Sequence, residues 1–104
     1  MWVRLTHIPC NPDNAAELKR IYSQDIVPAV MQQPGLVEIF LMEPTAATEP
    51  FVSCTLWQDK ANADLYESSG TYKSMVDKVR HLVAGQPTLT SYQAEVSRQD
   101  KRAA

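Results

Sequence analysis

The chain has 104 residues, of which 44% are hydrophobic and 21% are charged, and its formal net charge is −2. These values predict one globular domain, which we assign to residues 1–97, followed by a polar tail at 98–104. No apolar run approaches the ~20 residues that cross a bilayer, and neither a secretory signal nor a basic patch for nucleic acid is visible. We therefore expect a cytoplasmic protein with no membrane or nucleic-acid partner.

The first half of the chain alternates between strand and helix patterns. Residues 2–8 carry alternating β-favouring side chains and predict a strand. Residues 11–31 begin with a capping pattern around a proline and continue with apolar side chains at helical spacing. Pro28 is expected to kink or end this helix. A Pro-Gly turn then leads into a second predicted strand over residues 36–42.

The second half repeats the pattern with one strand before its helix and one after. Residues 51–57 predict a third strand, and a helix over residues 60–83 follows almost at once, interrupted near Gly70. The last strand is predicted over residues 89–96. The order β-α-β-β-α-β is typical of the ferredoxin-like α+β fold, in which two helices cover one face of an antiparallel sheet.

Strand periodicity divides the side chains between the two faces of this sheet. A purely apolar set is expected under the helices: Val3, Leu5, Val37, Ile39, Leu41, Val52, Cys54 and Leu56. A mixed set is expected on the bare face: Trp2, Arg4, Thr6, Glu38, Phe40, Met42, Phe51, Ser53, Thr55 and Trp57. That second face is too apolar for water, and a second copy of the sheet would cover it, so we predict a homodimer with room for a small-molecule ligand.

Several short motifs in this order and spacing carry a family resemblance. They are Pro34-Gly35, Thr55-Leu56-Trp57-Gln58-Asp59, Ala61, Tyr66 and Ser69-Gly70-Thr71-Tyr72. Over residues 1–96 the chain resembles the antibiotic biosynthesis monooxygenase family of dimeric α+β barrels. The resemblance implies a ferredoxin-like protomer and a barrel-forming homodimer. Members of that family oxidise aromatic polyketides without a cofactor, degrade haem or isomerise small signalling molecules.

The residues that carry chemistry in that family are mostly replaced here. The cofactor-independent oxygenases have an asparagine four positions before the strand-end tryptophan, a tyrosine six after it and an arginine twenty after it. This chain has Ser53, Ala63 and Asp77 at those positions. In the haem-degrading branch, the axial histidine corresponds to Val76 and the pocket tryptophan to Tyr66. The comparison argues against haem degradation, and we predict no cofactor and no metal.

Two residues of the predicted barrel face are candidates for substrate binding. Trp57 is suited to stacking on a planar ligand, and equally to sealing the corner between strand and helix. Arg4 is suited to binding a carboxylate, enolate or phenolate, and equally to pairing with Glu38 on the same face. Phe40, on that face too, is a third candidate substrate contact.

The remaining candidates are ionisable side chains near the strand end and the helix break. His7 is the candidate general base, although a lone histidine at a strand edge is more often a surface residue. Tyr66 and Tyr72 flank the break at Gly70, where their phenols can hydrogen-bond a substrate oxygen or simply pack. We assign Tyr72 a catalytic role and Tyr66 a substrate-binding role.

Our leading hypothesis from the sequence is a cofactor-independent monooxygenase that acts on a small aromatic or enolisable molecule between sheet and helices. Arg4 would stabilise a substrate anion held against Trp57 and Tyr72, with His7 as the base. The alternative is a non-catalytic small-molecule-binding or stress-associated barrel. A third reading has the cavity filled by side chains, so that the barrel only holds the dimer together.

Overall fold

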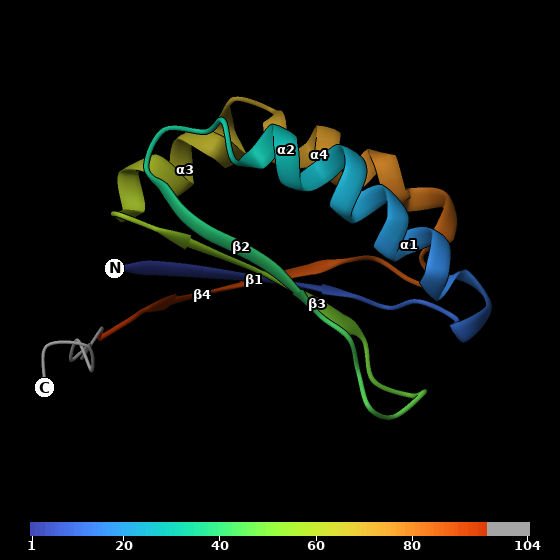
Figure 1. The fold of residues 1–104 in the computed structure, drawn as a ribbon. Coiled ribbons are helices and arrows are strands. Elements are labelled where there is room, and N and C mark those ends of the chain that lie inside the picture. The colour runs from blue at the N-terminus through green and yellow to red at the C-terminus, as the bar shows by residue number, and fades with distance from the viewer. Residues whose placement is uncertain (96–104) are drawn as a thin grey trace, which may run out of the picture.

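The computed structural model describes residues 1–95, so the predicted tail at 98–104 lies outside the described residues. Its core is an antiparallel four-stranded sheet in the order β2-β3-β1-β4 (Figure 1). The strands are β1 (Trp2–Ile8), β2 (Leu36–Met42), β3 (Phe51–Trp57) and β4 (Thr88–Gln93). The first three match the predicted ranges. The last covers residues 88–93 where we had predicted 89–96, so it begins one residue earlier and ends before residue 94. The ferredoxin-like α+β fold is thereby confirmed.

The helical segment between β1 and β2 changes its winding along its length. It consists of η1 (Pro12–Asn14), α1 (Ala15–Ile21), the π-helical turn η2 (Tyr22–Ile26) and α2 (Val27–Val30). Pro28 lacks an amide hydrogen, and its ring would crowd the carbonyl four residues earlier in a regular α-helix. The wider π turn just before it is one way to relieve that crowding, and the helix continues through Pro28 to Val30.

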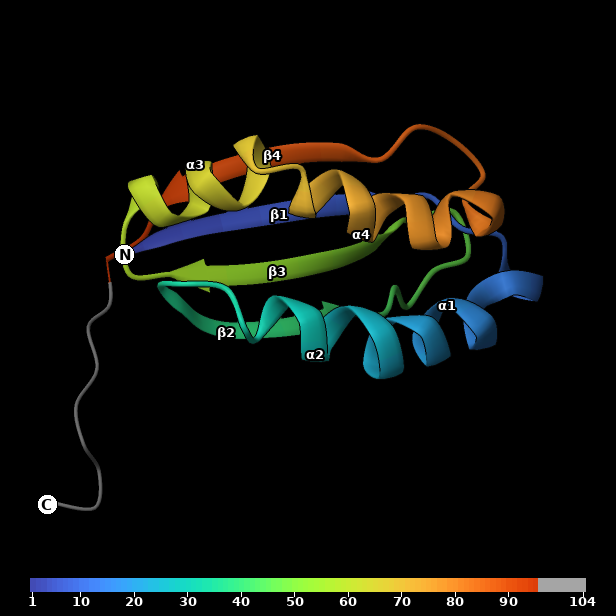
Figure 2. The same ribbon diagram turned by 90° about the horizontal axis from the view of Figure 1, so that it is seen from above.

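The second helical segment is broken as predicted. It consists of α3 (Lys60–Ser68), α4 (Thr71–Val79) and η3 (Arg80–Leu82). Asp59 caps α3 by accepting a hydrogen bond from the backbone of Asn62 (2.9 Å). Gly70 separates the two helices with a φ of 88°, a left-handed conformation that glycine adopts at little cost. Both helical segments lie side by side on the same face of the sheet (Figure 2).

The predicted division of side chains between the sheet faces is correct for Ile39 and Leu41 of β2, and it is wrong for β1 and β3. The helices cover Arg4, Phe51, Ser53, Thr55 and Trp57, all of them buried. Polar groups are tolerated there because the helices and neighbouring side chains supply hydrogen-bond partners. Hydrophobicity therefore did not identify the covered face. A bulge between Leu36 and Glu38 also shifts the alternation of β2 against β3.

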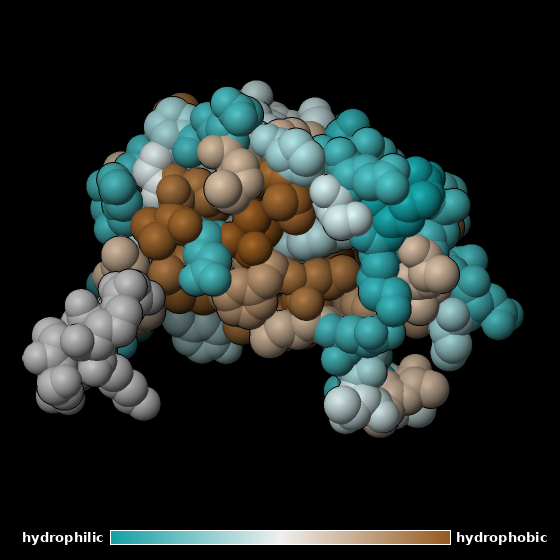
Figure 3. Space-filling view, in the orientation of Figure 1, coloured by the Kyte–Doolittle hydropathy of each residue, from teal (hydrophilic) through white to brown (hydrophobic). Residues whose placement is uncertain are grey.

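The open face of the sheet carries the apolar side chains of β1 and β3 that we had expected under the helices. Its side chains follow from the strand register: Val3, Leu5, His7, Glu38, Phe40, Met42, Val52, Cys54, Leu56, Thr88, Thr90 and Tyr92. Phe40, Met42 and Tyr92 are strongly exposed. Apolar side chains also gather along the β2 and α2 side of the molecule (Figure 3), where Met31 and Val37 are exposed. An apolar sheet face is therefore still exposed, although other residues form it than we had expected. The homodimer that would cover it remains a prediction.

Within residues 1–95, none of the helices is both long and apolar enough to span a membrane.

Candidate functional site

A small cavity lies between the helices and the covered face of the sheet. Its volume is about 40 Å³, enough for a few water molecules or one small molecule. Apolar walls come from both helical segments and from β2, including Leu18, Ile39 and Met75. Its polar walls are Arg4, Thr6, Tyr22, Ser53, Thr55, Tyr66 and Tyr72. An apolar space with a few convergent polar groups is the usual composition of a small-molecule site.

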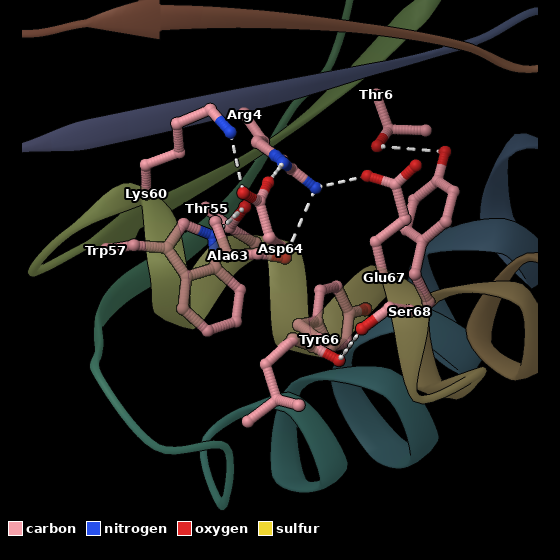
Figure 4. Close-up of polar contacts among 12 residues, drawn as sticks. Arg4, Thr6, Thr55, Trp57, Lys60, Ala63, Asp64, Tyr66, Glu67 and Ser68 are labelled. Atoms are coloured by element: carbon pink, nitrogen blue, oxygen red, sulfur yellow. Dashed lines mark hydrogen bonds and ion pairs between the residues drawn. The ribbon is translucent and has the colours of Figure 1, made fainter.

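Arg4 is buried under α3 and bound by two carboxylates (Figure 4). Its Nη1 donates to the carbonyl of Ala63 (3.2 Å) and to the carboxylate of Glu67, and its Nη2 donates to Asp64 (2.5 Å). The pairing with Glu38 that we considered does not occur, because Glu38 lies on the opposite face of the sheet. Arg4 therefore joins β1 to α3, and its charge is balanced inside the protein.

The carboxylate of Asp64 is shared between two cations. Lys60 donates to its second oxygen (2.6 Å), one helical turn away. The pKa of Asp64 is held below its usual value, chiefly by the hydrogen bond from Lys60 and further by the charges of Lys60 and Arg4. Two cations and two carboxylates, with Glu67 as the fourth group, make a locally neutral cluster. Our sequence analysis missed both acids, although their three-residue spacing on one helix face after Trp57 indicated a shared partner.

Three aromatic side chains, Trp57, Tyr66 and Tyr72, pack in a row beside the helix break. Trp57 is fully buried, its Nε1 donates to Thr55 Oγ1 (2.8 Å), and its ring lies 5.1 Å from that of Tyr66. Tyr66 meets Tyr72 edge to face at 6.0 Å. Trp57 therefore supports the site from behind Tyr66 and is not itself a wall of the cavity.

The hydroxyls of Tyr66 and Tyr72 have different partners. Thr6 donates weakly to Tyr72 Oη (3.5 Å), which leaves the phenolic hydrogen of Tyr72 available. Tyr66 is 6% exposed, and its hydroxyl has no hydrogen-bond partner among the described residues. Burial raises the pKa of Tyr66, with a further contribution from the neighbouring Tyr72, so its phenol stays protonated at neutral pH. Both side chains are placed to donate a hydrogen bond to an anion in the cavity.

Tyr22 is a wall residue that the sequence analysis did not include among the site candidates. The π turn begins at this residue, and its hydroxyl bonds Ser53 Oγ (2.7 Å) on β3. Burial raises the pKa of Tyr22 to about 12, against the opposing effect of its hydrogen bond with Ser53. A buried tyrosine usually has a hydrogen-bond partner for its hydroxyl, so the position of Tyr22 on the buried face of the helix could have predicted a polar partner there.

A larger groove of about 330 Å³ adjoins the cavity at the edge formed by α4 and β4. The two spaces share walls at Tyr72, Val76, Pro87 and Leu89. The groove's other walls are Glu67, Lys73, Arg80 and Gln86. The interior is therefore an apolar space with a polar groove outside it, and Tyr72 stands between them.

The structure brings together some of the predicted site residues and separates others. Arg4, Tyr66 and Tyr72 line one cavity. His7 and Phe40 lie on the open face, where His7 Nε2 contacts Thr90 Oγ1 (3.2 Å). We had predicted that His7 and Tyr72 act in one pocket, and this prediction was wrong. His7 points to the open face of the sheet, because side chains alternate along β1, whereas Tyr72 lines the cavity on the other face.

Fold and site together define an α+β protein with a small-molecule cavity between a ferredoxin-like sheet and its helices. A family model described as antibiotic biosynthesis monooxygenase matches residues 1–78. The chain belongs to this family, as the resemblance in the sequence indicated. No curated protein has a significant sequence match to the chain.

Solved structures with the same fold include several members of this family. The haem degrader MhuD of Mycobacterium tuberculosis, with two haems bound in its active site, is similar with a TM-score of 0.78 and 16% identity, over 95% of this chain and 100% of that one. A proposed antibiotic biosynthesis monooxygenase from Deinococcus radiodurans has a TM-score of 0.77 and 17% identity, over 96% and 98%. One from Nitrosomonas europaea has a TM-score of 0.72 and 15% identity, over 90% and 98%. At these identities the likeness shows the fold alone.

Proposed function

We propose that the protein is a monooxygenase that oxidises a small aromatic or enolisable molecule without a cofactor. The observation that carries the proposal is the pair of phenols, Tyr66 and Tyr72, that line a cavity adjoining a ligand-sized groove. The groove takes the ring system, since the cavity of about 40 Å³ admits only an oxygen substituent or dioxygen. Dioxygen would lie against the apolar walls formed by Leu18 and Met75.

The chemistry uses the substrate as its own reductant. A substrate anion is held by hydrogen bonds from Tyr72 and Tyr66, which stabilise negative charge in a largely dry site. Electrons pass from this anion to dioxygen, a carbon–oxygen bond forms, and the resulting peroxide loses water. One dioxygen is consumed for each methylene converted to a carbonyl, with water as the second product, so no further reductant is needed.

Among its described walls, the cavity offers no obvious general base to deprotonate the substrate. Among the described residues, no carboxylate or imidazole lines the cavity. The substrate must therefore enter as an anion or lose its proton in the groove, where Glu67 is half exposed. Haem fits poorly as a cofactor, because Val76 stands where the haem-degrading relatives place their axial histidine. Within residues 1–95, no histidine lines the cavity or the groove.

The test is aerobic incubation with anthrone, whose methylene carbon is acidic and flanked by aromatic rings. We expect oxygen uptake and anthraquinone formation in equal amounts, above the rate in buffer. Tyr72→Phe should lower kcat/KM at least about tenfold, because one oxyanion donor is lost. Tyr92→Phe, on the open face, is the matched control and should leave kcat/KM unchanged. His7→Ala should also have little effect, and equal rates with and without protein would contradict the proposal.

A second candidate function is a non-catalytic barrel that binds a small apolar molecule. The observation in its favour is the lack of a base among the cavity walls of the described residues. This reading predicts saturable binding of anthrone at the groove, monitored by its absorbance or by NMR, with no anthraquinone formed. Turnover sensitive to Tyr72→Phe would exclude it.

A further inference from the structure

The groove at α4 and β4 carries two cationic side chains that share a single carboxylate. Arg80 donates from Nε (3.2 Å) and Nη2 (3.1 Å) to the same oxygen of Asp77. Lys73 lies 3.5 Å from the other oxygen of Asp77 and is strongly exposed. Arg80 Nη1 has no hydrogen-bond partner among the described residues. The cluster therefore has one positive charge in excess.

The other charges near the groove do not cancel this excess. Glu67, the acidic wall residue of the groove, is bound to Arg4. Arg4 and Lys60 together balance Glu67 and Asp64. The positive charge beside Lys73 and Arg80 is thus local, in a protein whose formal net charge is −2. Asp77 is not a wall of the groove, whereas Lys73 and Arg80 are.

The excess positive charge lies where it can bind one end of a ligand whose other end reaches the cavity. Tyr72 and Val76 precede Arg80 on the same helical segment and are walls of both the groove and the cavity. A ligand whose reacting end lies at Tyr72 would extend through the groove past Pro87 toward Lys73 and Arg80. Gln86 adds an amide to this part of the groove. A carboxylate matches these groups, because it accepts from several N–H donors at once.

We propose that the substrate is an aromatic carboxylate, with its ring in the groove and its carboxylate bound by Lys73 and Arg80. This inference rests on the proposed site and narrows its substrate class from any small aromatic molecule to an anionic one. It assigns Lys73 and Arg80 a role in specificity, apart from the oxyanion donors Tyr66 and Tyr72. Asp77 sets the strength of the site by neutralising part of its charge.

The test compares two probes of the same shape, 2-naphthoate and its neutral amide, 2-naphthamide. Their dissociation constants are measured by titration calorimetry at low ionic strength. We expect the wild-type protein to bind naphthoate about fivefold more tightly than the amide, and the preference to shrink as salt is added. Backbone NMR shifts on binding should centre on α4 and residues 86–89.

Charge variants should move this preference in opposite directions. Arg80→Gln and Lys73→Gln should each bring the affinity ratio toward one, with naphthamide binding unchanged within about twofold. Asp77→Asn removes the competing carboxylate and should raise the ratio above the wild-type value. Lys19→Gln is the matched control. It removes an exposed lysine of α1 that pairs with Glu43, and it should leave the ratio unchanged.

Three results would overturn the inference: no binding of either probe, a wild-type ratio near one, or a ratio kept in both Arg80→Gln and Lys73→Gln. The measurement does not depend on oxygenation. A protein that fails to oxidise anthrone while showing the predicted ratios would contradict oxidation of a neutral aromatic substrate and support the carboxylate site. Anthrone turnover with equal binding of the two probes would do the reverse.

Discussion

Arg4 shows how one residue can define a site and also hold the fold together. Its side chain is 9% exposed, and it joins β1 to Asp64, Glu67 and the carbonyl of Ala63 on α3. A buried cation is stable only with such partners. In this conformation the charge of Arg4 is already balanced by two carboxylates, and the phenols of Tyr66 and Tyr72 line the same cavity.

Replacing Arg4 tests this structural role. Arg4→Met should lower the free energy of unfolding by about 2 kcal/mol, less than for a fully buried pair, because Asp64 and Glu67 are half exposed and can bind water instead. Urea denaturation measures the change. Lys60→Met is the control: it removes an exposed partner of the same Asp64 and should cost less than about 1 kcal/mol. Equal losses in the two variants would mean that burial of Arg4 adds nothing.

At the scale of elements, two glycines place α3 and α4 against the sheet for different reasons. Gly70 breaks the helices with a φ of 88°, and a Cβ there would meet nothing within 4 Å. Gly35, with a φ of 79°, lies where a Cβ would come within 2.3 Å of the Asn62 side chain in α3. Gly35 also accepts a hydrogen bond from the backbone of Gln58 (2.8 Å). The close approach of the turn before β2 to the start of α3 therefore requires a glycine.

Alanine substitutions separate these two effects. Gly70→Ala should cost about 1 kcal/mol of stability, the price of a left-handed alanine. Gly35→Ala should cost about 3 kcal/mol, because a clash with Asn62 adds to the same strain. In an Asn62→Gly background the cost of Gly35→Ala should fall to that of Gly70→Ala, measured by denaturant unfolding. An unchanged cost would show that the clash is relieved in some other way.

At the scale of the whole molecule, the open sheet face is the feature without a structural partner in the described chain. Phe40, Met42 and Tyr92 are exposed on it, beside the half-buried Val3 and Leu5. We propose that a second copy of the chain covers this face. A small ligand fits this face less well than a second copy does, because the face is an open apolar surface. The cavity and groove that could hold a ligand lie on the opposite side of the sheet.

A charge placed on this face should separate the two copies. Phe40→Asp is expected to convert a wild-type dimer to a monomer in size-exclusion chromatography with light scattering, because an unpaired carboxylate would be buried at the interface. Leu65→Asp is the matched control, since Leu65 is also an exposed apolar residue but lies on α3. A monomeric wild-type protein, or a dimer that survives Phe40→Asp, would contradict the proposed interface.

The sequence by itself determined the family, the order of elements, three strand ranges and the break at Gly70. These are local properties, since turn residues, capping and periodicity act over a few positions. Only the tertiary structure decided which face of β1 and β3 the helices cover. Both sets of side chains were apolar enough to be buried, and the polar groups of Arg4, Ser53 and Thr55 found their partners in residues far along the chain or beside them in the sheet. Tyr66 and Tyr72 line the cavity, whereas His7 lies outside it. Side chains alternate along β1, so His7 points to the open face while Thr6, next to it in the sequence, lines the cavity.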